Sequence, residues 1–238
     1  MDSIHRDKVN WWGKHGSVSE IHPRVDATDD ALGSPTGPSH MAIQFVTGNE
    51  GKVREAREYF SGIEEVEQVV FDYTEVQSDD LGEIAAHGAL EAFEELGGDG
   101  VLVGDTGLFV DALEGFPGPY SAYVEDTVGV ERLWRLAREE ENRRAHFRTV
   151  LAYADGEVLR TSELSSGEQR DPRELGVETF TGSVAGTLVA PRGEGGFGYD
   201  PIFEYNGQTM AEMSTEEKNA ISHRGRALEA FAEWYADR

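Results

Sequence analysis

The sequence predicts an α/β fold, and three observations indicate it. The first is an apolar run with β-branched residues at 42–46, typical of a buried strand, followed by apolar residues at helical spacing over 53–60. The second is the repetition of this order, because strand-like runs at 66–71 and 100–108 enclose an amphipathic helical pattern over 84–96. Strands that alternate with helices in this way predict a sheet against which helices pack.

The third observation is a change of pattern in the second half of the chain. Strand-like runs at 145–153, 157–162 and 178–189 suggest antiparallel strands in a meander, which could form a second lobe. An amphipathic helical pattern over 220–235 follows them. We therefore expect the second half to be richer in strands than the first.

The turn between the first strand and the first helix is a candidate site. It consists of Thr47-Gly48-Asn49-Glu50-Gly51-Lys52. A glycine-rich turn before a helix directs free backbone N–H groups and the positive end of the helix dipole to one place, which suits an anion. It is not a Walker A loop, because its glycine spacing is too short and Val53 stands where a magnesium-binding Ser or Thr is needed. The turn is either an anion site or an ordinary strand–helix turn with a solvated lysine.

Lysine usage favours a functional Lys52. The chain has only four lysines, Lys8, Lys14, Lys52 and Lys218, and arginine supplies the rest of its 21 basic residues. Only two of these lysines follow Met41, and both lie beside groups suited to phosphate.

Further candidate residues lie in three other segments. Asp105 is predicted at the carboxyl end of a central strand, where α/β sheets place their ligand sites, although Asp is also a common turn residue before a glycine. The loop 193–203 carries four glycines, so it either brings aromatic rings and bare N–H groups close to a ligand or simply packs its aromatics. Lys218, His223 and Arg224 gather where a helix is predicted to begin; because the helix dipole disfavours cations there, anion binding would explain them.

The composition argues against several classes of function. A net charge of −25 disfavours binding to nucleic acids or anionic membranes, which need a basic surface. An acidic, lysine-poor chain is typical of a high-salt cytoplasm, where charges are screened within about 3 Å at 1 M salt, or is simply very soluble. The absence of cysteine, of a long apolar run and of a signal-peptide pattern predicts a cytoplasmic protein.

Residues 1–40 differ in character from the rest of the chain. They hold four of the seven histidines, show no strand or helix period, and include a Gly/Pro/Ser/Thr stretch at 33–38. We expect 1–40 to be a disordered N-terminal extension or sequence upstream of a true start at Met41, and 41–238 to be the functional domain.

Five motifs in order resemble the inosine/xanthosine triphosphate pyrophosphatase family. They are Thr47-Gly48-Asn49-x-x-Lys52, Asp105-Thr106-Gly107-Leu108, Gly115-Phe116-Pro117-Gly118-Pro119-Tyr120-Ser121, Phe197-Gly198-Tyr199-Asp200-Pro201 and Lys218-Asn219-x-x-Ser222-His223-Arg224. Any one motif is a weak signal, but five in the family's order are specific. The resemblance spans essentially all of 41–238.

The resemblance implies a fold, an activity and an assembly. Such enzymes hydrolyse ITP, dITP and XTP to the monophosphate and pyrophosphate. Their fold is an elongated α/β structure in which a long mixed sheet and two lobes surround a deep cleft, and they are usually dimers. For this chain the resemblance therefore implies a nucleoside triphosphate substrate, Mg²⁺ as cofactor and a homodimer.

The resemblance also implies roles for individual residues. Asp105 would bind Mg²⁺ and help to activate the attacking water, and Glu75 looks like the second metal ligand. Thr47, Asn49 and Lys52 would hold the triphosphate. The neighbouring residues also expected to bind the substrate are Gly48, Glu50, Gly51 and Thr106. The ring of Phe197 would stack on the purine. The residues expected to shape the base pocket or to contact base and phosphates are Gly198, Tyr199, Asp200, Lys218, His223 and Arg224.

Two positions depart from the family pattern. Gly104 stands where an acid usually precedes the catalytic Asp, and Gly88 falls where a Lys is common on the helix after the Glu75 loop. Both put the strength of metal and phosphate binding in doubt. A nucleotide-binding module with a decayed metal site, and a pyrophosphatase for modified pyrimidine nucleotides, therefore stay open as alternatives.

Overall fold

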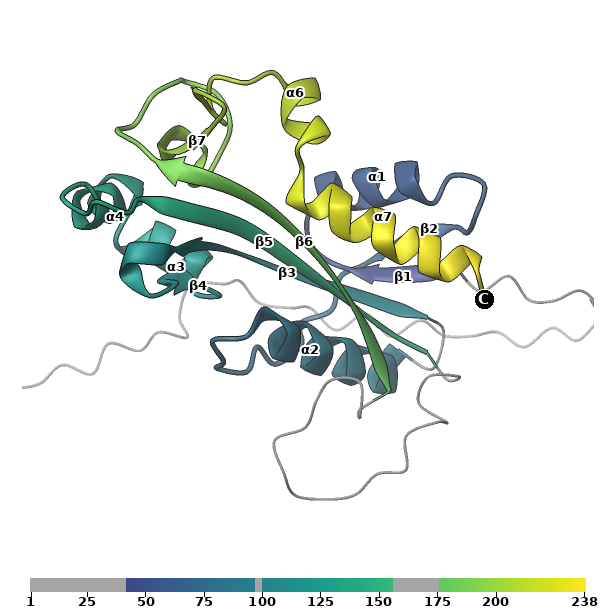
Figure 1. The fold of residues 1–238 in the computed structure, drawn as a ribbon. Coiled ribbons are helices and arrows are strands. Elements are labelled where there is room, and N and C mark those ends of the chain that lie inside the picture. Colours follow the sequence, from purple (N-terminus) through teal and green to yellow (C-terminus); the bar gives the residue numbers. More distant parts are fainter. Residues whose placement is uncertain (1–41, 97–99, 156–175) are drawn as a thin grey trace, which may run out of the picture. The chain divides into compact units, whose positions relative to one another are not determined.

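The centre of the described chain is a mixed sheet of eight strands (Figure 1). The computed structural model describes residues 42–96, 100–155 and 176–238, so the predicted extension at 1–40 and the predicted strand at 157–162 lie outside the described residues. The strands are β1 (Ile43–Val46), β2 (Val66–Val69), β3 (Val101–Val110), β4 (Pro117–Gly118), β5 (Arg144–Ala154), β6 (Val177–Leu188), β7 (Phe203–Tyr205) and β8 (Gln208–Thr209).

Helices pack on both faces of this sheet. The α-helices are α1 (Glu50–Tyr59), α2 (Leu81–Leu96), α3 (Ser121–Thr127), α4 (Val130–Ala137), α6 (Thr215–Ala220) and α7 (His223–Ala236), with short 3₁₀ turns η1 (Asp111–Leu113) and η3 (Asp200–Ile202). Figure 1 shows α1 and α7 on one face and α2 on the other. Among the described residues, no helix is long and apolar enough to cross a membrane.

The strand order confirms the predicted α/β fold and its meander. The sheet runs β2-β1-β3-β5-β6-β7-β8, and β4 pairs with β3 beside this path. The strand β1 is parallel to both β2 and β3, whereas the pairs from β3 to β8 are antiparallel. The strands of the second half therefore extend the same sheet that the first half begins.

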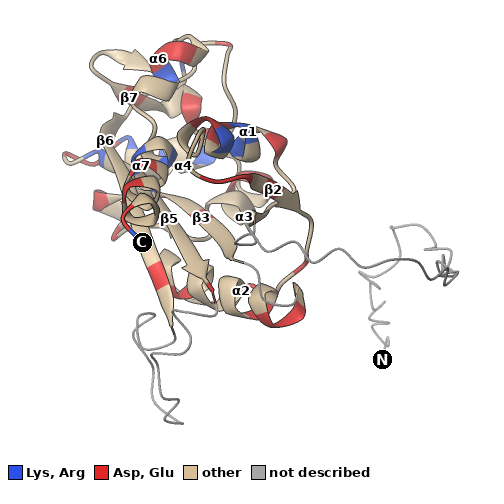
Figure 2. Ribbon diagram, turned by 90° about the vertical axis from the view of Figure 1, so that its right-hand side faces the viewer, with Lys and Arg blue, Asp and Glu red and all other residues tan. Residues whose placement is uncertain are grey.

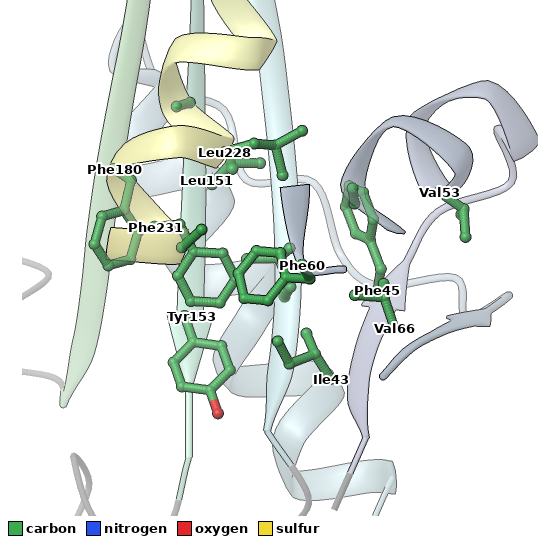
Figure 3. Close-up of a cluster of buried hydrophobic side chains, with 14 residues drawn as sticks. Ile43, Phe45, Val53, Phe60, Val66, Leu151, Tyr153, Phe180, Leu228 and Phe231 are labelled. Carbon is green, nitrogen blue, oxygen red and sulfur yellow. The ribbon is translucent and has the colours of Figure 1, made fainter. Parts of the chain in front are cut away.

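Alternation along the central strands divides the apolar side chains between two cores. Leu102 and Leu151 pack with α1 and α7, whereas Val101, Val103 and Val150 pack with α2. The period of two along a strand causes this division, because successive side chains point to opposite faces. Figure 3 shows the first core, in which the rings of Phe60, directly after α1, Tyr153 of β5 and Phe231 of α7 meet. These two cores hold the end of β1 and the first part of β3 beside the candidate residues.

The prediction that the strand ends at Asp105 is wrong. The strand β3 has ten residues and continues to Val110, so Asp105 lies in its middle. Its pairing with β1 ends at Val103, opposite Val46, while its pairing with β5 continues over the whole strand. Asp105 consequently lies just beyond the carboxyl end of β1, the position where parallel strands place ligand sites.

The helix predicted over 220–235 is confirmed as α7, which begins at His223, and a second helix, α6, precedes it where the apolar spacing indicated none. Each begins with a serine cap: the Ser214 side chain accepts the N–H of Glu217, and the Ser222 side chain accepts that of Gly225. Lys218 therefore lies in the last turn of α6, where the helix dipole favours a cation. Only His223 and Arg224, at the start of α7, remain where the dipole disfavours positive charge.

Candidate active site

Two cavities share the side chain of Lys52. The first, which we call the loop cavity, has a volume of about 490 Å³ and lies between α1, the loop 193–203, α6 and the start of α7. The second, the strand-end cavity, has about 480 Å³ and lies between the end of β1 and the loop after β2. Because Lys52 lines both, an elongated ligand can contact it from either side.

Most of the predicted site residues line one of these cavities. Those in the loop cavity are Asn49, Lys52, Thr106, Phe197, Gly198, Tyr199, Asp200, Lys218, His223 and Arg224. Those in the strand-end cavity are Thr47, Gly48, Lys52 and Glu75. Asp105 lies between Gly104, which lines the strand-end cavity, and Thr106, which lines the loop cavity. Glu50 and Gly51 line neither.

Asn49 shapes the turn at the start of α1. Its side-chain oxygen accepts the N–H groups of Gly51 at 2.9 Å and Lys52 at 3.2 Å, and its own N–H donates to the Thr47 hydroxyl at 3.1 Å. This is an N-cap, which satisfies N–H groups that the helix itself leaves unpaired. Since the cap uses two of those groups, an anion at this turn would depend chiefly on the Lys52 ammonium.

The charge of Lys52 lies among three other charged groups. Burial lowers the pKa of Lys52, and the charge of Arg224 acts in the same direction, whereas Asp105 and Glu75 raise it. A partly buried ammonium whose charge is incompletely balanced gains from an anionic ligand. Lys52 therefore has the electrostatic setting that phosphate binding requires.

Asp105 has a raised proton affinity. Burial raises the pKa of Asp105 to about 6, and the nearby charge of Glu75 contributes, against the opposing effects of Lys52 and of the Thr106 N–H. That N–H donates to Asp105 Oδ1 at 2.8 Å and fixes the carboxyl group. A carboxylate with a pKa near neutrality is suited to accept a proton from water.

The two carboxylates also suit a hard cation. Mg²⁺ binds oxygen ligands and commonly takes only one or two carboxylates, with water and phosphate oxygens in its other positions. Asp105 and the exposed Glu75 supply such a pair, while the described residues contain no group of three or more His, Cys, Asp or Glu that could hold a metal. The donor set therefore fits Mg²⁺ held jointly with a substrate.

The two glycines that depart from the family pattern lie against large side chains. A Cβ on Gly104 would lie 2.8 Å from Leu151 Cδ2, and one on Gly88 would lie 2.6 Å from the Tyr73 ring. The Tyr73 ring thus packs directly on α2 and lines the strand-end cavity. Burial, with the charges of Asp105 and Glu75, raises the pKa of Tyr73 to about 12, so it stays a neutral hydroxyl donor. Nothing in the sequence pattern singled out this tyrosine.

The glycine-rich loop is folded around Asp200. The buried Asp200 carboxylate accepts the Phe197 N–H at 2.9 Å and forms an ion pair with Lys218. Gly196 has φ of +75°, and a Cβ there would lie 2.3 Å from Asp200 Oδ2, so this position requires glycine. The Tyr199 hydroxyl donates to the Ser121 carbonyl at 2.7 Å and ties the loop to α3.

This folded loop presents the Phe197 ring to the cavity. The side chain lines the loop cavity and is 74% exposed, although the residues around it are held by hydrogen bonds. Lys218 Nζ lies 4.9 Å from the ring centroid. An exposed ring on a rigid loop offers a flat apolar surface for a planar ligand.

His223 is a neutral side chain inside a cationic cluster. Its ring stacks on Phe147 with centroids 5.2 Å apart, and its buried Nδ1 has no hydrogen-bond partner among the described residues. Burial lowers the pKa of His223 to about 3, with further contributions from Arg224 and Lys52. The imidazole is therefore uncharged at neutral pH and can donate or accept a hydrogen bond without carrying charge.

Glu55 of α1 positions Arg224, which lines the loop cavity. The Arg224 Nε forms an ion pair with the Glu55 carboxylate, which also accepts the Ser222 hydroxyl at 3.2 Å. This contact joins α1 to α7 across 169 residues of sequence. Figure 2 shows how the charged residues are distributed. Lys and Arg gather around α1, α6 and the start of α7, whereas α2 carries Glu and no Lys or Arg.

Comparison with known proteins identifies the family. The Ham1 family matches residues 43–234, which is almost the whole of the predicted functional domain. This chain belongs to the Ham1 family. It is 48% identical over 198 residues to the dITP/XTP pyrophosphatase of Thermococcus kodakarensis, with 82% of this chain and 97% of that protein covered. It is 50% identical over 200 residues to the dITP/XTP pyrophosphatase of Methanopyrus kandleri, with 82% and 96% covered.

A solved structure supports the same membership. The HAM1 protein of Coxiella burnetii superimposes with a TM-score of 0.69 at 26% identity, covering 83% of this chain and all of that one. The family resemblance and the fold class predicted from the motifs are therefore confirmed. In this Ham1 protein the two cavities that meet at Lys52 are the place where the family's motifs converge.

Proposed function

We propose that this chain hydrolyses ITP, dITP and XTP to the nucleoside monophosphate and pyrophosphate. The observation that carries the proposal is the pair of cavities that share Lys52. The loop cavity offers the exposed Phe197 ring to a flat base, and the strand-end cavity lies beside the Asp105 and Glu75 carboxylates. The names of the relatives, dITP/XTP pyrophosphatase, support the choice of substrates.

Each side of the site would have a separate task. The purine would stack on Phe197, and its 6-oxo group would meet donors among Lys218, His223 and Arg224. The phosphates would extend past Lys52, whose ammonium would pair with phosphate oxygens. Splitting the α–β phosphoanhydride then requires a water in line with the leaving pyrophosphate.

Asp105 is the residue we propose for proton removal from that water. The Thr106 N–H holds the orientation of its carboxyl group, and burial raises the pKa of Asp105 in the metal-free protein. Asp105 and Glu75 would hold Mg²⁺, which when bound neutralises phosphate charge and acidifies a coordinated water. The neutral Tyr73 hydroxyl lies near the same carboxylates and would stabilise them by donating a hydrogen bond.

We also propose a homodimer, supported by aromatic side chains that the described fold leaves exposed. Phe116 is 41% exposed, Tyr120 42% and Tyr123 70%; Phe116 directly precedes β4, Tyr120 directly precedes α3, and Tyr123 lies on α3. Exposed aromatic residues that lie close together are typical of protein interfaces. Sedimentation of the wild type and of Tyr123→Ser tests this; equal monomeric masses for both would contradict the proposal.

The decisive test is pyrophosphate release from a panel of nucleotides. ITP, dITP, XTP, ATP, GTP and dUTP are compared with Mg²⁺ and with EDTA, at low and high salt, with Asp105→Asn as the inactive control. We expect kcat/KM for dITP and XTP roughly 10²- to 10⁴-fold above that for ATP. Each buried donor that faces the 6-amino group of adenine costs about 1–3 kcal/mol, and two such mismatches give this range.

Other outcomes of this panel identify the alternatives. Nucleotide binding without pyrophosphate release would indicate a decayed site, for which Gly104 is the observation in favour. Preferential hydrolysis of dUTP would indicate a pyrimidine enzyme. Comparable hydrolysis of ATP and ITP would refute base selection even if the pyrophosphatase activity stood.

A further inference from the structure

An unpaired carboxylate lies on the wall of the loop cavity. Glu125 of α3 lines the cavity, and its Oε2 would lie 3.2 Å from a Cβ placed on Gly198, so it sits against the backbone next to Phe197. Only two acidic residues line this cavity, Glu125 and Asp200. Asp200 is already bonded to Lys218 and to the Phe197 N–H. Glu125 forms no hydrogen bond or ion pair with any residue that the structure describes.

The surroundings of Glu125 favour a hydrogen-bond donor as its partner. Burial raises the pKa of Glu125, and the charges of Asp126 and Asp200 act in the same direction. No cation among the described residues forms an ion pair with it, and the Lys218 ammonium is paired with Asp200. A carboxylate in such a position gains from an N–H group that enters the cavity, because hydrogen bonds to charged groups are stronger than neutral ones.

The bases of the proposed substrates offer such a group. Hypoxanthine and xanthine carry a donor, N1–H, beside the 6-oxo acceptor, whereas adenine carries an unprotonated N1 beside a 6-amino donor. The cavity contains donors for an oxo group in Lys218, His223 and Arg224, and among its described lining residues Glu125 is the carboxylate without a partner. The two kinds of group therefore match the edge of a 6-oxopurine and mismatch that of adenine.

We propose that Glu125 is a specificity-determining residue that accepts the N1–H of a 6-oxopurine base and repels the N1 lone pair of adenine. The proposal rests on the proposed function for the location of the base, and it adds a contact to N1 that the motifs did not indicate. Guanine carries the same N1–H, so Glu125 separates 6-oxopurines from adenine and leaves the exclusion of guanine to other groups.

The test compares Glu125→Gln with a matched control on the neighbouring residue. Gln keeps the size of the side chain but can also donate to N1 of adenine. Asp126→Asn removes the same charge from an exposed residue that does not line the cavity. We expect E125Q to lower the ratio of kcat/KM for ITP over ATP by about ten- to a hundredfold, the range of one charged hydrogen bond, and D126N to change it less than twofold.

A binding measurement makes the test independent of turnover. Calorimetric titration with IMP and with AMP should show the same loss of preference in E125Q and none in D126N. If the wild type released no pyrophosphate from any nucleotide, the proposed function would fail while the IMP/AMP ratio still tested Glu125. Equal losses for both bases in E125Q, or equal ratios in E125Q and D126N, would overturn the assignment. Thermal melts verify folding, and Glu125→Ala replaces E125Q if that variant does not fold.

Discussion

Acidification should destabilise this protein through His223. The pKa of this side chain is about 3 in the folded protein and 6.5 in the unfolded chain, because burial and the charges of Arg224 and Lys52 oppose its protonation. Between these two values the unfolded chain binds a proton that the folded protein does not bind. The free energy of unfolding is therefore fully retained above pH 6.5 and falls as the pH drops from 6.5 toward 3.

The structure sets the size of this effect. No described residue accepts a hydrogen bond from the buried Nδ1, so protonation of the imidazole gains no hydrogen bond there. A pH of 5 lies about 1.5 units below the pKa of the unfolded histidine. At 1.36 kcal/mol per unit, the free energy of unfolding therefore falls by about 2 kcal/mol. A loss of this size is a substantial share of the 5–15 kcal/mol that is typical of folded domains.

Urea unfolding of the wild type and of His223→Phe at pH 8 and pH 5 measures this effect. The phenyl ring can still stack on Phe147 and loses no hydrogen bond at Nδ1. Because both proteins share every other titrating group, the difference between their pH dependences isolates His223. The wild type should lose about 2 kcal/mol more than H223F between pH 8 and pH 5.

The control substitution is His87→Gln, which replaces an exposed histidine on α2. Equal losses of stability in the wild type and H223F would refute the reasoning, since they would mean that the folded protein protonates His223 as readily as the unfolded chain does.

Three other predictions concern turnover, phosphate binding and the extent of the domain. Asp105→Asn should lower kcat more than a hundredfold, about 2.7 kcal/mol of barrier, while the protein stays folded with a melting temperature no lower than that of the wild type; a smaller loss in a pyrophosphate assay would place the proton acceptor elsewhere. Lys52→Ala and Lys218→Ala should each weaken nucleotide binding by about ten- to a hundredfold in titrations, but only K218A should also melt at lower temperature, because it leaves the buried Asp200 without its cation. A protein that begins at Met41 should keep its activity and melting temperature, and insolubility of that protein would show that residues 1–40 are needed for folding.

Several features of the site were predictable from the sequence because they depend on neighbouring residues. The cap that Asn49 provides involves residues two and three positions away, and Gly196 is needed because of Asp200 four positions later. The same applies to the alternation of β3 and β5, which requires only the period of a strand. Contacts between residues that are close in the sequence produce a recognisable sequence pattern, and the five motifs consist of such residues.

The extent of the strands and helices was less predictable. Asp105 reads as the end of a strand because the apolar run stops there, yet the pairing with β5 carries β3 to Val110. The helix that the apolar spacing predicts over 220–235 begins only at His223, because the Ser222 side chain caps α7 there. In both cases a tertiary pairing or a cap overrode the local signal.

The sequence by itself determined the order of strands and helices, the glycine-rich turns and the identity of the groups suited to phosphate and base. Only the tertiary structure decided which charges meet. Glu55 reaches Arg224 across 169 residues, Tyr199 reaches Ser121 across 78, and Glu125 comes to lie beside Gly198. Burial sets the proton affinities of Asp105 and His223 in the same way. The physical reason is range: backbone propensity acts over a few residues, whereas desolvation and Coulomb interaction depend on whatever the fold brings within several ångströms.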